Sequence, residues 1–186
     1  MKRSVLAVGM TLLVLVGCVT PNYKAPSGQN VASLTVTTNT AESWNQQVRF
    51  FQGEDCSDYP GQLAGLLNSK RIGIDTKESI EHTIPAGSPM TVSVFASVPR
   101  DDSFLEIFFK GVKRAAAENR WCEAFVSFIP ESGAKYRAAY KIDGTPCSIT
   151  LMKDKDGQSV HVTNARPSTA CSLVAKQKLG DLGLTN

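Results

Sequence analysis

The sequence predicts a mainly β domain, an antiparallel β-sandwich with one or two short helices, and one layout that fits is immunoglobulin-like. Short runs rich in β-branched and aromatic residues alternate apolar with polar side chains. Turn clusters of Gly, Pro and Asp separate these runs, and only short segments show helical spacing. The composition, 42% hydrophobic and 20% charged over 186 residues, is typical of a folded globule. We expect one domain over residues 31–175 and a C-terminal tail over 176–186.

The start of the chain has the features of an export signal. Lys2 and Arg3 supply a positive beginning, and the apolar run from Val5 to Val16 is too short to remain in a bilayer of about 30 Å as a permanent helix. Residues 1–17 are therefore expected to be removed. That removal takes away two bases and no acid, so the net charge falls from +3 to +1. Such a balanced charge predicts no basic face for nucleic acid.

The apolar run ends in Leu15-Val16-Gly17-Cys18, which resembles the lipobox of bacterial lipoproteins. The resemblance implies that the Cys18 thiol receives a diacylglycerol group, that cleavage occurs before Cys18, and that the new amino group is acylated as well. Several acyl chains, at about 0.8 kcal/mol per buried CH₂, would hold the protein on a membrane. Within this family the residue after the cysteine influences sorting, and Val19 implies the outer membrane.

The first part of the mature chain is predicted to hold a tether, two strands and a helix. Residues 18–30 contain two prolines and a Ser-Gly pair without an apolar period, which predicts a flexible, lipidated tether. Residues 33–38 and 47–52 are rich in β-branched or aromatic side chains and are predicted strands. A short helix is predicted from Pro60 to Asn68, because Pro suits the first helical position and leucines follow at helical spacing.

The middle of the chain combines a strong strand with an ambiguous stretch. Residues 84–89 form a turn cluster, and residues 90–98 alternate as a strand with one wet face. Residues 101–120 begin with capping side chains and contain an alanine run, which favours a helix. The apolar run that follows the capping residues could instead form a strand.

The second half carries the strongest β signal. Four segments separated by turn residues are predicted to pair as an antiparallel meander, namely 122–130, 135–143, 147–154 and 158–164. After Pro167 the sequence allows a short turn of helix before Gly180 and Gly183.

One stretch of this region resembles a known group of proteins. The run from Phe128 to Gly133, followed by Tyr136 and placed between Cys122 and Cys147, is similar to a loose pattern in small uncharacterised envelope lipoproteins of bacteria. This resemblance covers about a fifth of the mature chain and implies no activity.

Four cysteines remain after Cys18, and an oxidising compartment favours two disulfides among them. In a single meander, the strands that begin at Cys122 and Cys147 would lie about 9 to 10 Å apart, beyond the roughly 7 Å that a disulfide spans. We therefore favour Cys56 with Cys122 and Cys147 with Cys171. If the strands divide between two sheets, Cys122 with Cys147 and Cys56 with Cys171 becomes the alternative. Each bridge should contribute about 2 to 4 kcal/mol.

The sequence predicts no catalytic residue, metal site or cofactor. Neither histidine, His82 or His161, has ligand spacing to the other or to a cysteine, and His161 is expected in solvent. A run at 154–157 is faintly like a calcium loop, but a hairpin turn explains it. Acid pairs could act as in glycosidases, although loops and caps also explain them: Glu54, Asp55, Asp58, Asp101 and Asp102. Core packing is preferred to a binding face for the aromatic cluster of Phe104, Phe108, Phe109 and Trp121.

We therefore expect a non-enzymatic binding or structural module of the bacterial envelope, attached to the outer membrane by its lipid and serving an envelope protein partner. The alternative is an inhibitor of an extracellular hydrolase such as a lysozyme, and a hydrolase that uses carboxylates comes third. An inhibitor should present a rigid protruding loop with Ser or Lys at its tip. A hydrolase should show a cleft with convergent carboxylates, and a binding module only an open edge or an apolar patch.

Overall fold

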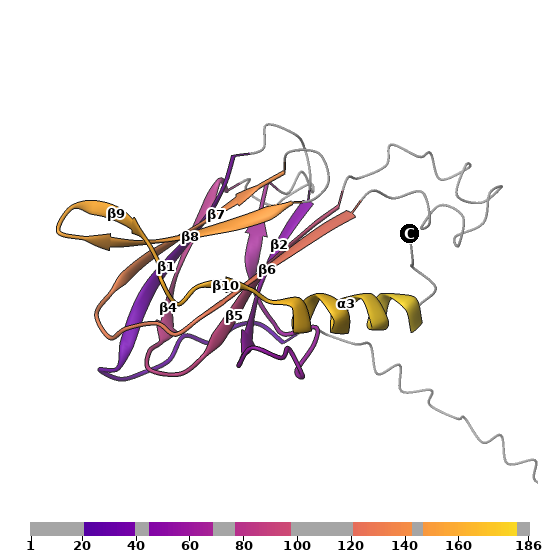
Figure 1. Cartoon of the computed structure of the whole chain (residues 1–186), viewed down its shortest axis with the longest axis horizontal. Helices are drawn as coiled ribbons and strands as arrows, with labels where there is room; N and C mark the ends of the chain where they lie inside the picture. Colours follow the sequence, from indigo (N-terminus) through magenta and orange to yellow (C-terminus); the bar gives the residue numbers. More distant parts are fainter. Residues whose placement is uncertain (1–20, 40–44, 69–76, 98–120, 143–146, 182–186) are drawn as a thin grey trace, which may run out of the picture.

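The computed structural model of the chain describes residues 21–39, 45–68, 77–97, 121–142 and 147–181. These residues form two five-stranded sheets packed face to face, with one helix beside them (Figure 1). The predicted β-sandwich is confirmed. The immunoglobulin-like layout is not confirmed, and one sheet contains a parallel pair of strands.

The first sheet, called the β1 sheet here, has the strand order β4-β1-β7-β8-β9. Its strands are β1 (Val31–Thr38), β4 (Ser79–Pro85), β7 (Lys135–Lys141), β8 (Ser148–Lys155) and β9 (Gln158–His161). β1 pairs antiparallel with β4 and parallel with β7, whereas β7, β8 and β9 form a meander.

The second sheet, called the β5 sheet, has the strand order β10-β6-β5-β2-β3, and all its pairs are antiparallel. Its strands are β2 (Asn45–Gln52), β3 (Gln62–Leu67), β5 (Met90–Ser97), β6 (Trp121–Phe128) and β10 (Arg166–Pro167). The predicted four-strand meander is therefore wrong in its first member, because β6 lies in the other sheet from β7, β8 and β9.

The main core lies between the two sheets. Side chains at alternate positions of β1 and β5, such as Leu34, Val36, Val92 and Val94, are fully buried there. This alternation follows from the period of two in an extended strand, which sends neighbouring side chains to opposite faces. The sequence pattern that predicts these strands is thus the pattern of the core itself.

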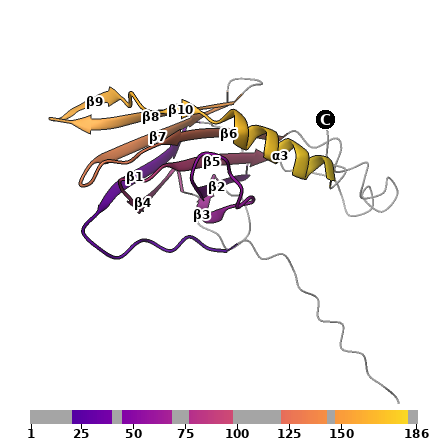
Figure 2. The same cartoon turned by 60° about the horizontal axis from the view of Figure 1, so that its bottom comes forward.

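A second, smaller core covers the outer face of the β5 sheet. The helix α3 (Thr169–Asp181) lies beside β6 (Figure 2) and buries Cys171 and Ala175 with Phe51 and Phe125 of the sheet. Ser168 caps α3, because its Oγ accepts the amide hydrogen of Cys171 over an N–O distance of 3.2 Å. The sequence allows only a short turn of helix here, and α3 extends to Asp181 within the predicted tail.

The predicted helix over residues 60–68 is wrong, because Gln62–Leu67 form β3 instead. This segment pairs with β2 across a bulge, so the backbone groups that face β2 have partners without a helix. Gly65 within it would cost a helix about 1 kcal/mol relative to Ala, and it lies close to Ile80. Tertiary pairing therefore outweighs the helical spacing of the leucines. The ambiguous stretch 101–120 lies outside the described residues.

The β8–β9 hairpin extends past the ends of the neighbouring strands in both views (Figures 1 and 2). Its tip is the two-residue turn Asp156-Gly157, and both residues have positive φ, 52° and 78°. Asp-Gly is a favoured pair for such a turn, so the hairpin predicted from the sequence is present. Within the described part of the chain, no helix has the length and apolar character needed to cross a bilayer.

Candidate functional site

Two disulfides join the elements, and they differ from the pairs favoured above. Cys56 bonds to Cys171 and Cys122 bonds to Cys147, with Cα atoms 5.0 Å and 6.1 Å apart. The favoured pairs, Cys56 with Cys122 and Cys147 with Cys171, are wrong, and the alternative pairing is present. The reason is the division of strands: β6 belongs to the β5 sheet and β8 to the β1 sheet, so Cys122 and Cys147 meet between the two layers.

The segment just after the predicted lipid attachment lies along the domain. The Tyr23 amide donates to the Leu63 carbonyl and the Leu63 amide donates to the Pro21 carbonyl, each over 2.8 Å. The Tyr23 hydroxyl donates to the Thr83 carbonyl of β4 over 2.8 Å, so Tyr23 spans from the β5 sheet to the β1 sheet. The sequence predicts a flexible tether over 18–30, but from Pro21 onward these contacts hold the chain. Cys18 lies outside the described residues.

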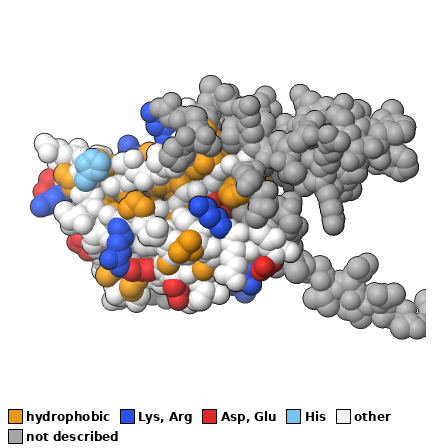
Figure 3. All heavy atoms as spheres, turned by 45° about the vertical axis from the view of Figure 1, so that its right-hand side comes forward, with side chains coloured by type: hydrophobic (Ala, Val, Ile, Leu, Met, Phe, Trp, Pro, Cys, Tyr) orange, Lys and Arg blue, Asp and Glu red, His pale blue; other side chains and the backbone are white. Residues whose placement is uncertain are grey.

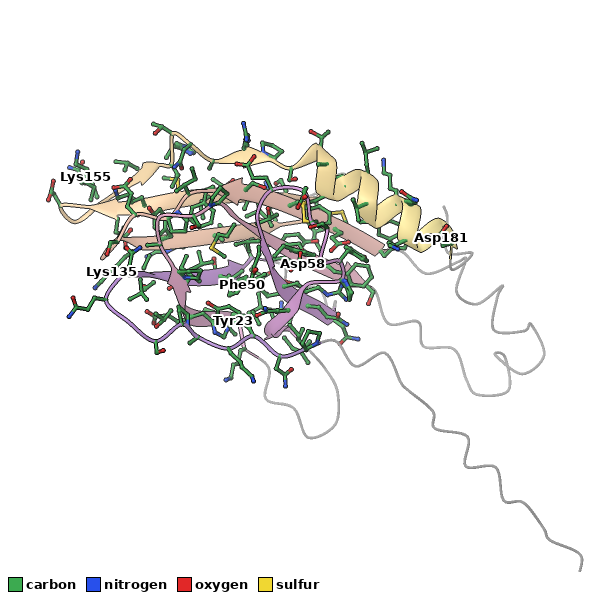
Figure 4. The ribbon with its side chains drawn as sticks, turned by 90° about the horizontal axis from the view of Figure 1, so that it is seen from below. Tyr23, Phe50, Asp58, Lys135, Lys155 and Asp181 are labelled. Atoms are coloured by element: carbon green, nitrogen blue, oxygen red, sulfur yellow. A yellow bond between two sulfur atoms is a disulfide. The ribbon has the colours of Figure 1, made fainter. Side chains whose placement is uncertain are left out.

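Tyr23 also packs against two rings at this edge of the sandwich. Its ring meets Phe50 edge-on at 4.7 Å and His82 edge-on at 5.5 Å between centroids. Figure 4 shows Tyr23 and Phe50 beside each other, seen from below the sandwich. Such edge-to-face pairs add about 0.5–1.5 kcal/mol each beyond the area they bury. The rings therefore hold the N-terminal segment against the edge of the sandwich, where it forms a wall.

That wall borders a groove of about 780 Å³ at the edge of the sandwich where β2 ends and β5 begins. The segment from Pro21 to Pro26 forms one side, and the ends of β2, β4 and β5 with the turn before β5 form the other. Its lining is mostly apolar, with a few polar side chains and a single charged one, Lys24: Pro21, Asn22, Tyr23, Lys24, Pro26, Phe50, Phe51, Gln52, Gly53, Gln62, Pro85, Ser88, Pro89 and Met90. A cleft of this size and character suits an apolar ligand.

His82 lies next to the groove, where the structure gives it aromatic and backbone contacts. It stands on β4, half-buried against Tyr23 and Phe50. Burial lowers the pKa of His82, and a hydrogen bond with the backbone of Ala64 opposes that shift. The lowered pKa favours the uncharged ring, which packs against these two aromatic side chains. His161 lies at the exposed end of β9.

A polar cluster lies on the outer face of the β5 sheet, beyond the small core. Ser93 on β5 donates from Oγ to Oε1 of Glu123 on β6 over 3.0 Å. Arg49 on β2 donates from Nη2 to Oε1 of Gln47 over 2.6 Å, and its guanidinium lies 5.6 Å from the centroid of the Phe95 ring. Within the described residues, the buried atoms Nε of Arg49 and Oε2 of Glu123 have no hydrogen-bond partner.

Burial is the main cause of the shifted pKa values in and around this cluster. Desolvation raises the pKa of Glu123, while the charge of Arg49 and the hydrogen bond from Ser93 lower it. The pKa values of Tyr59 and Tyr140 are raised first by burial and then by the charge of Glu123. The sequence alone does not reveal this cluster, because polar residues at alternate positions of a strand also predict a solvent-exposed face.

The carboxylates singled out from the sequence do not converge where the structure describes them. Glu54 pairs with Arg166, Asp55 accepts hydrogen bonds from Ser57, and Asp58 Oδ2 lies 3.5 Å from the Gln52 amide. Glu54 therefore ties its loop to β10, and Asp55 and Asp58 make contacts within their own part of the chain. Asp101 and Asp102, together with Phe104, Phe108 and Phe109, lie outside the described residues.

Trp121 is half-buried, and its ring stacks on Phe95, with centroids 6.2 Å apart. Over the described ranges, no group of three or more His, Cys, Asp or Glu side chains is placed to hold a metal ion. On the face that Figure 3 shows, acidic and basic side chains are interspersed rather than gathered by sign.

The sequence alone does not predict the groove either. Its wall is the segment interpreted as a tether, and the available signal was a tyrosine standing among prolines that limit the freedom of the chain. Comparison with models of known protein families gives no match, and comparison with curated proteins gives none either.

Proposed function

We propose that the protein is an exported, non-enzymatic binding module of the bacterial envelope, and that the groove beside Tyr23 is its binding site. The observation that carries the proposal is the groove itself, about 780 Å³ with an apolar lining, one lysine, and no carboxylate among the described residues that line it. Two disulfides fit an oxidising compartment, because they are rare in cytosolic proteins.

The attachment to the outer membrane is part of the same proposal and rests on the lipobox resemblance at Cys18. A Cys18→Ser chain should leave the membrane fraction or keep its leader, because serine offers no thiol for the diacylglycerol group. An unchanged membrane fraction would reject the anchor. Fractionation with intact-mass measurement makes that distinction.

The binding site can be tested with a photo-crosslinking side chain at Ser88, an exposed residue at the rim of the groove. A control carries the same side chain at Arg137, which is exposed on β7 of the other sheet. Irradiated cells should give a specific adduct with an envelope component from position 88 and not from position 137. Equal labelling at both positions, or none at 88, would contradict the groove as the binding site.

One observation favours a second candidate, an inhibitor of an extracellular hydrolase such as a lysozyme. The β8–β9 hairpin protrudes, and Figure 4 shows Lys155 at its outer end, away from the sheets. Ser159 Oγ donates to Asp154 Oδ1 over 3.0 Å across the hairpin and stiffens it. Purified protein should then slow lysis by a lysozyme, and Lys155→Ala should abolish the effect. No effect of the unaltered protein would eliminate this candidate for that enzyme.

A further inference from the structure

We infer that the groove takes the acyl chain of a single-chain anionic amphiphile, such as a long-chain fatty acid, with the acidic group at Lys24. This inference rests on the proposed function only in treating the groove as the binding site. It goes further by assigning the chemistry of the ligand from the walls of the groove.

The floor and one wall of the groove are hydrocarbon and aromatic surface. Phe50 and Met90 are only 3% and 4% exposed, and Tyr23, which bonds to one strand of each sheet, adds its ring to the lining. The volume of about 780 Å³ is within the range of roughly 300–1,000 Å³ that holds small ligands. Burial of an alkyl chain there would be favourable by about 0.8 kcal/mol for each CH₂ removed from water.

Several backbone groups of the walls are already paired and cannot bind a peptide. The Tyr23 amide and the Pro21 carbonyl are already paired with β3, and the Gly53 amide donates to the Pro89 carbonyl over 3.0 Å. Prolines contribute no N–H at four lining positions, Pro21, Pro26, Pro85 and Pro89. An extended peptide would bury amides and carbonyls without partners opposite these positions, at a cost of about 1–3 kcal/mol each. A hydrocarbon chain has no such groups.

The charge of the lining indicates which head group the ligand carries. Lys24 is exposed and is the one ionised side chain among the described residues that border the groove. A carboxylate or phosphate at the mouth would meet its ammonium group, whereas a cationic amphiphile would be repelled. The lining also contains polar side chains, such as Gln52 and Ser88, that would solvate a head group there.

The chain also limits how far the groove can lie from the proposed anchor. Pro21 follows Cys18 by three residues, which span at most about 11 Å at roughly 3.6 Å per residue. In the lipid-anchored form the groove would stay next to the bilayer surface, where single-chain amphiphiles partition. Ligand and site would therefore share one location.

The first test measures palmitate binding by native mass spectrometry and by displacement of the fluorescent fatty acid cis-parinaric acid. It uses the full chain with Cys18→Ser, which carries no acyl chain of its own. We expect saturable binding of one ligand per protein. Ser88→Trp, which fills the mouth, should weaken it at least tenfold, whereas Ser148→Trp at an exposed position of β8 should not. Unfolding curves of both variants show whether the fold is kept. No saturable binding by the parent chain, or equal loss in both folded variants, overturns the inference.

The second test addresses the charge without filling the groove. Lys24→Glu should weaken palmitate severalfold and leave hexadecanol, its neutral analogue, nearly unchanged, whereas Lys135→Glu on β7 should change neither. Equal binding of both ligands by the Lys24→Glu and parent chains would overturn the anionic assignment.

The outcomes separate this inference from the proposed function. A specific crosslink from position 88 without palmitate binding would reject the acyl ligand and keep the groove as a binding site, and an adduct with an envelope peptide would do the same. If position 88 gives no specific crosslink and the protein does not bind palmitate, both proposals are rejected. If the lipidated protein excludes palmitate while the Cys18→Ser chain binds it, the groove holds its own anchor and the external ligand is rejected.

Discussion

At the scale of single residues, the polar cluster of Arg49, Ser93 and Glu123 is unusual for the covered face of a sheet. Arg49 donates to Gln47 and Glu123 accepts from Ser93, but a buried atom of each charged side chain lacks a partner among the described residues. Buried charge of this kind costs stability unless it is fully paired. Such retained polar groups are often found where function requires them.

Replacement of Glu123 by Gln should therefore stabilise the protein at neutral pH. The raised pKa means that the native state holds a proton more tightly than the unfolded chain, so stability falls as pH rises from the ordinary value near 4.5 through the raised native value. Glu123→Gln should gain on the order of 1 kcal/mol at pH 8 and nothing at pH 3. Urea unfolding at the two pH values measures this, with exposed Glu78→Gln as the control. A loss of stability at pH 8 would refute the argument.

Gly61 is a second residue whose identity the structure requires. Its φ is +74°, and an added Cβ would lie 2.8 Å from Cε1 of Phe51 and 2.9 Å from the carbonyl oxygen of Phe50. Gly157 has a similar φ of +78° with nothing within 4 Å of such a Cβ. Gly61→Ala should cost about 2–4 kcal/mol and Gly157→Ala about 1 kcal/mol, because both lose the backbone freedom of glycine but only the first creates a clash. Thermal unfolding that gives equal losses would exclude the steric part.

At the scale of elements, the alternation of apolar and polar residues predicts the position of most of the described strands but not the strands with which they pair. The segments around Val36, Val94 and Ala138 carry a buried face in their own letters, so β1, β5 and β7 were predictable. β3 was not, because the pairing with β2 that makes it a strand is absent from its local sequence. The same limit applies to β6, whose sheet depends on the whole topology.

The candidate site was the least predictable part, because the chain builds it from distant segments. Tyr23, Phe50 and Met90 come from three separate regions, and each has an ordinary local role. Tyr23 reads as a tether residue, and Phe50 and Met90 read as strand residues. No local sequence pattern predicts that their side chains border one groove, because only the folded chain brings them together.

At the scale of the whole molecule, the two disulfides hold different units together. Cys56–Cys171 ties the loop after β2 to α3, across a sequence separation of 115, and Cys122–Cys147 ties one sheet to the other, across a separation of 25. The first therefore constrains most of the domain in the unfolded chain, and the second only a short loop.

Removal of each bridge by paired Cys→Ser changes should reveal this difference. The chain-entropy estimate is about 5 kcal/mol for the longer loop and about 3.5 kcal/mol for the shorter one. We expect the Cys56→Ser, Cys171→Ser chain to lose more stability than the Cys122→Ser, Cys147→Ser chain in guanidinium unfolding. The reverse order would mean that native packing around the cysteines, rather than loop closure, governs the effect.

The nested order of these bridges also sets a demand on biosynthesis. A chain that enters an oxidising compartment with its N-terminus first presents Cys56 and Cys122 before Cys147 and Cys171, so pairing in order of arrival produces two mismatched crosslinks. Native linkage requires either that Cys56 waits for the last cysteine or that early mismatches are exchanged through a thiolate. An oxidase alone should therefore give little correctly linked protein in the cell, and a disulfide isomerase should be needed as well.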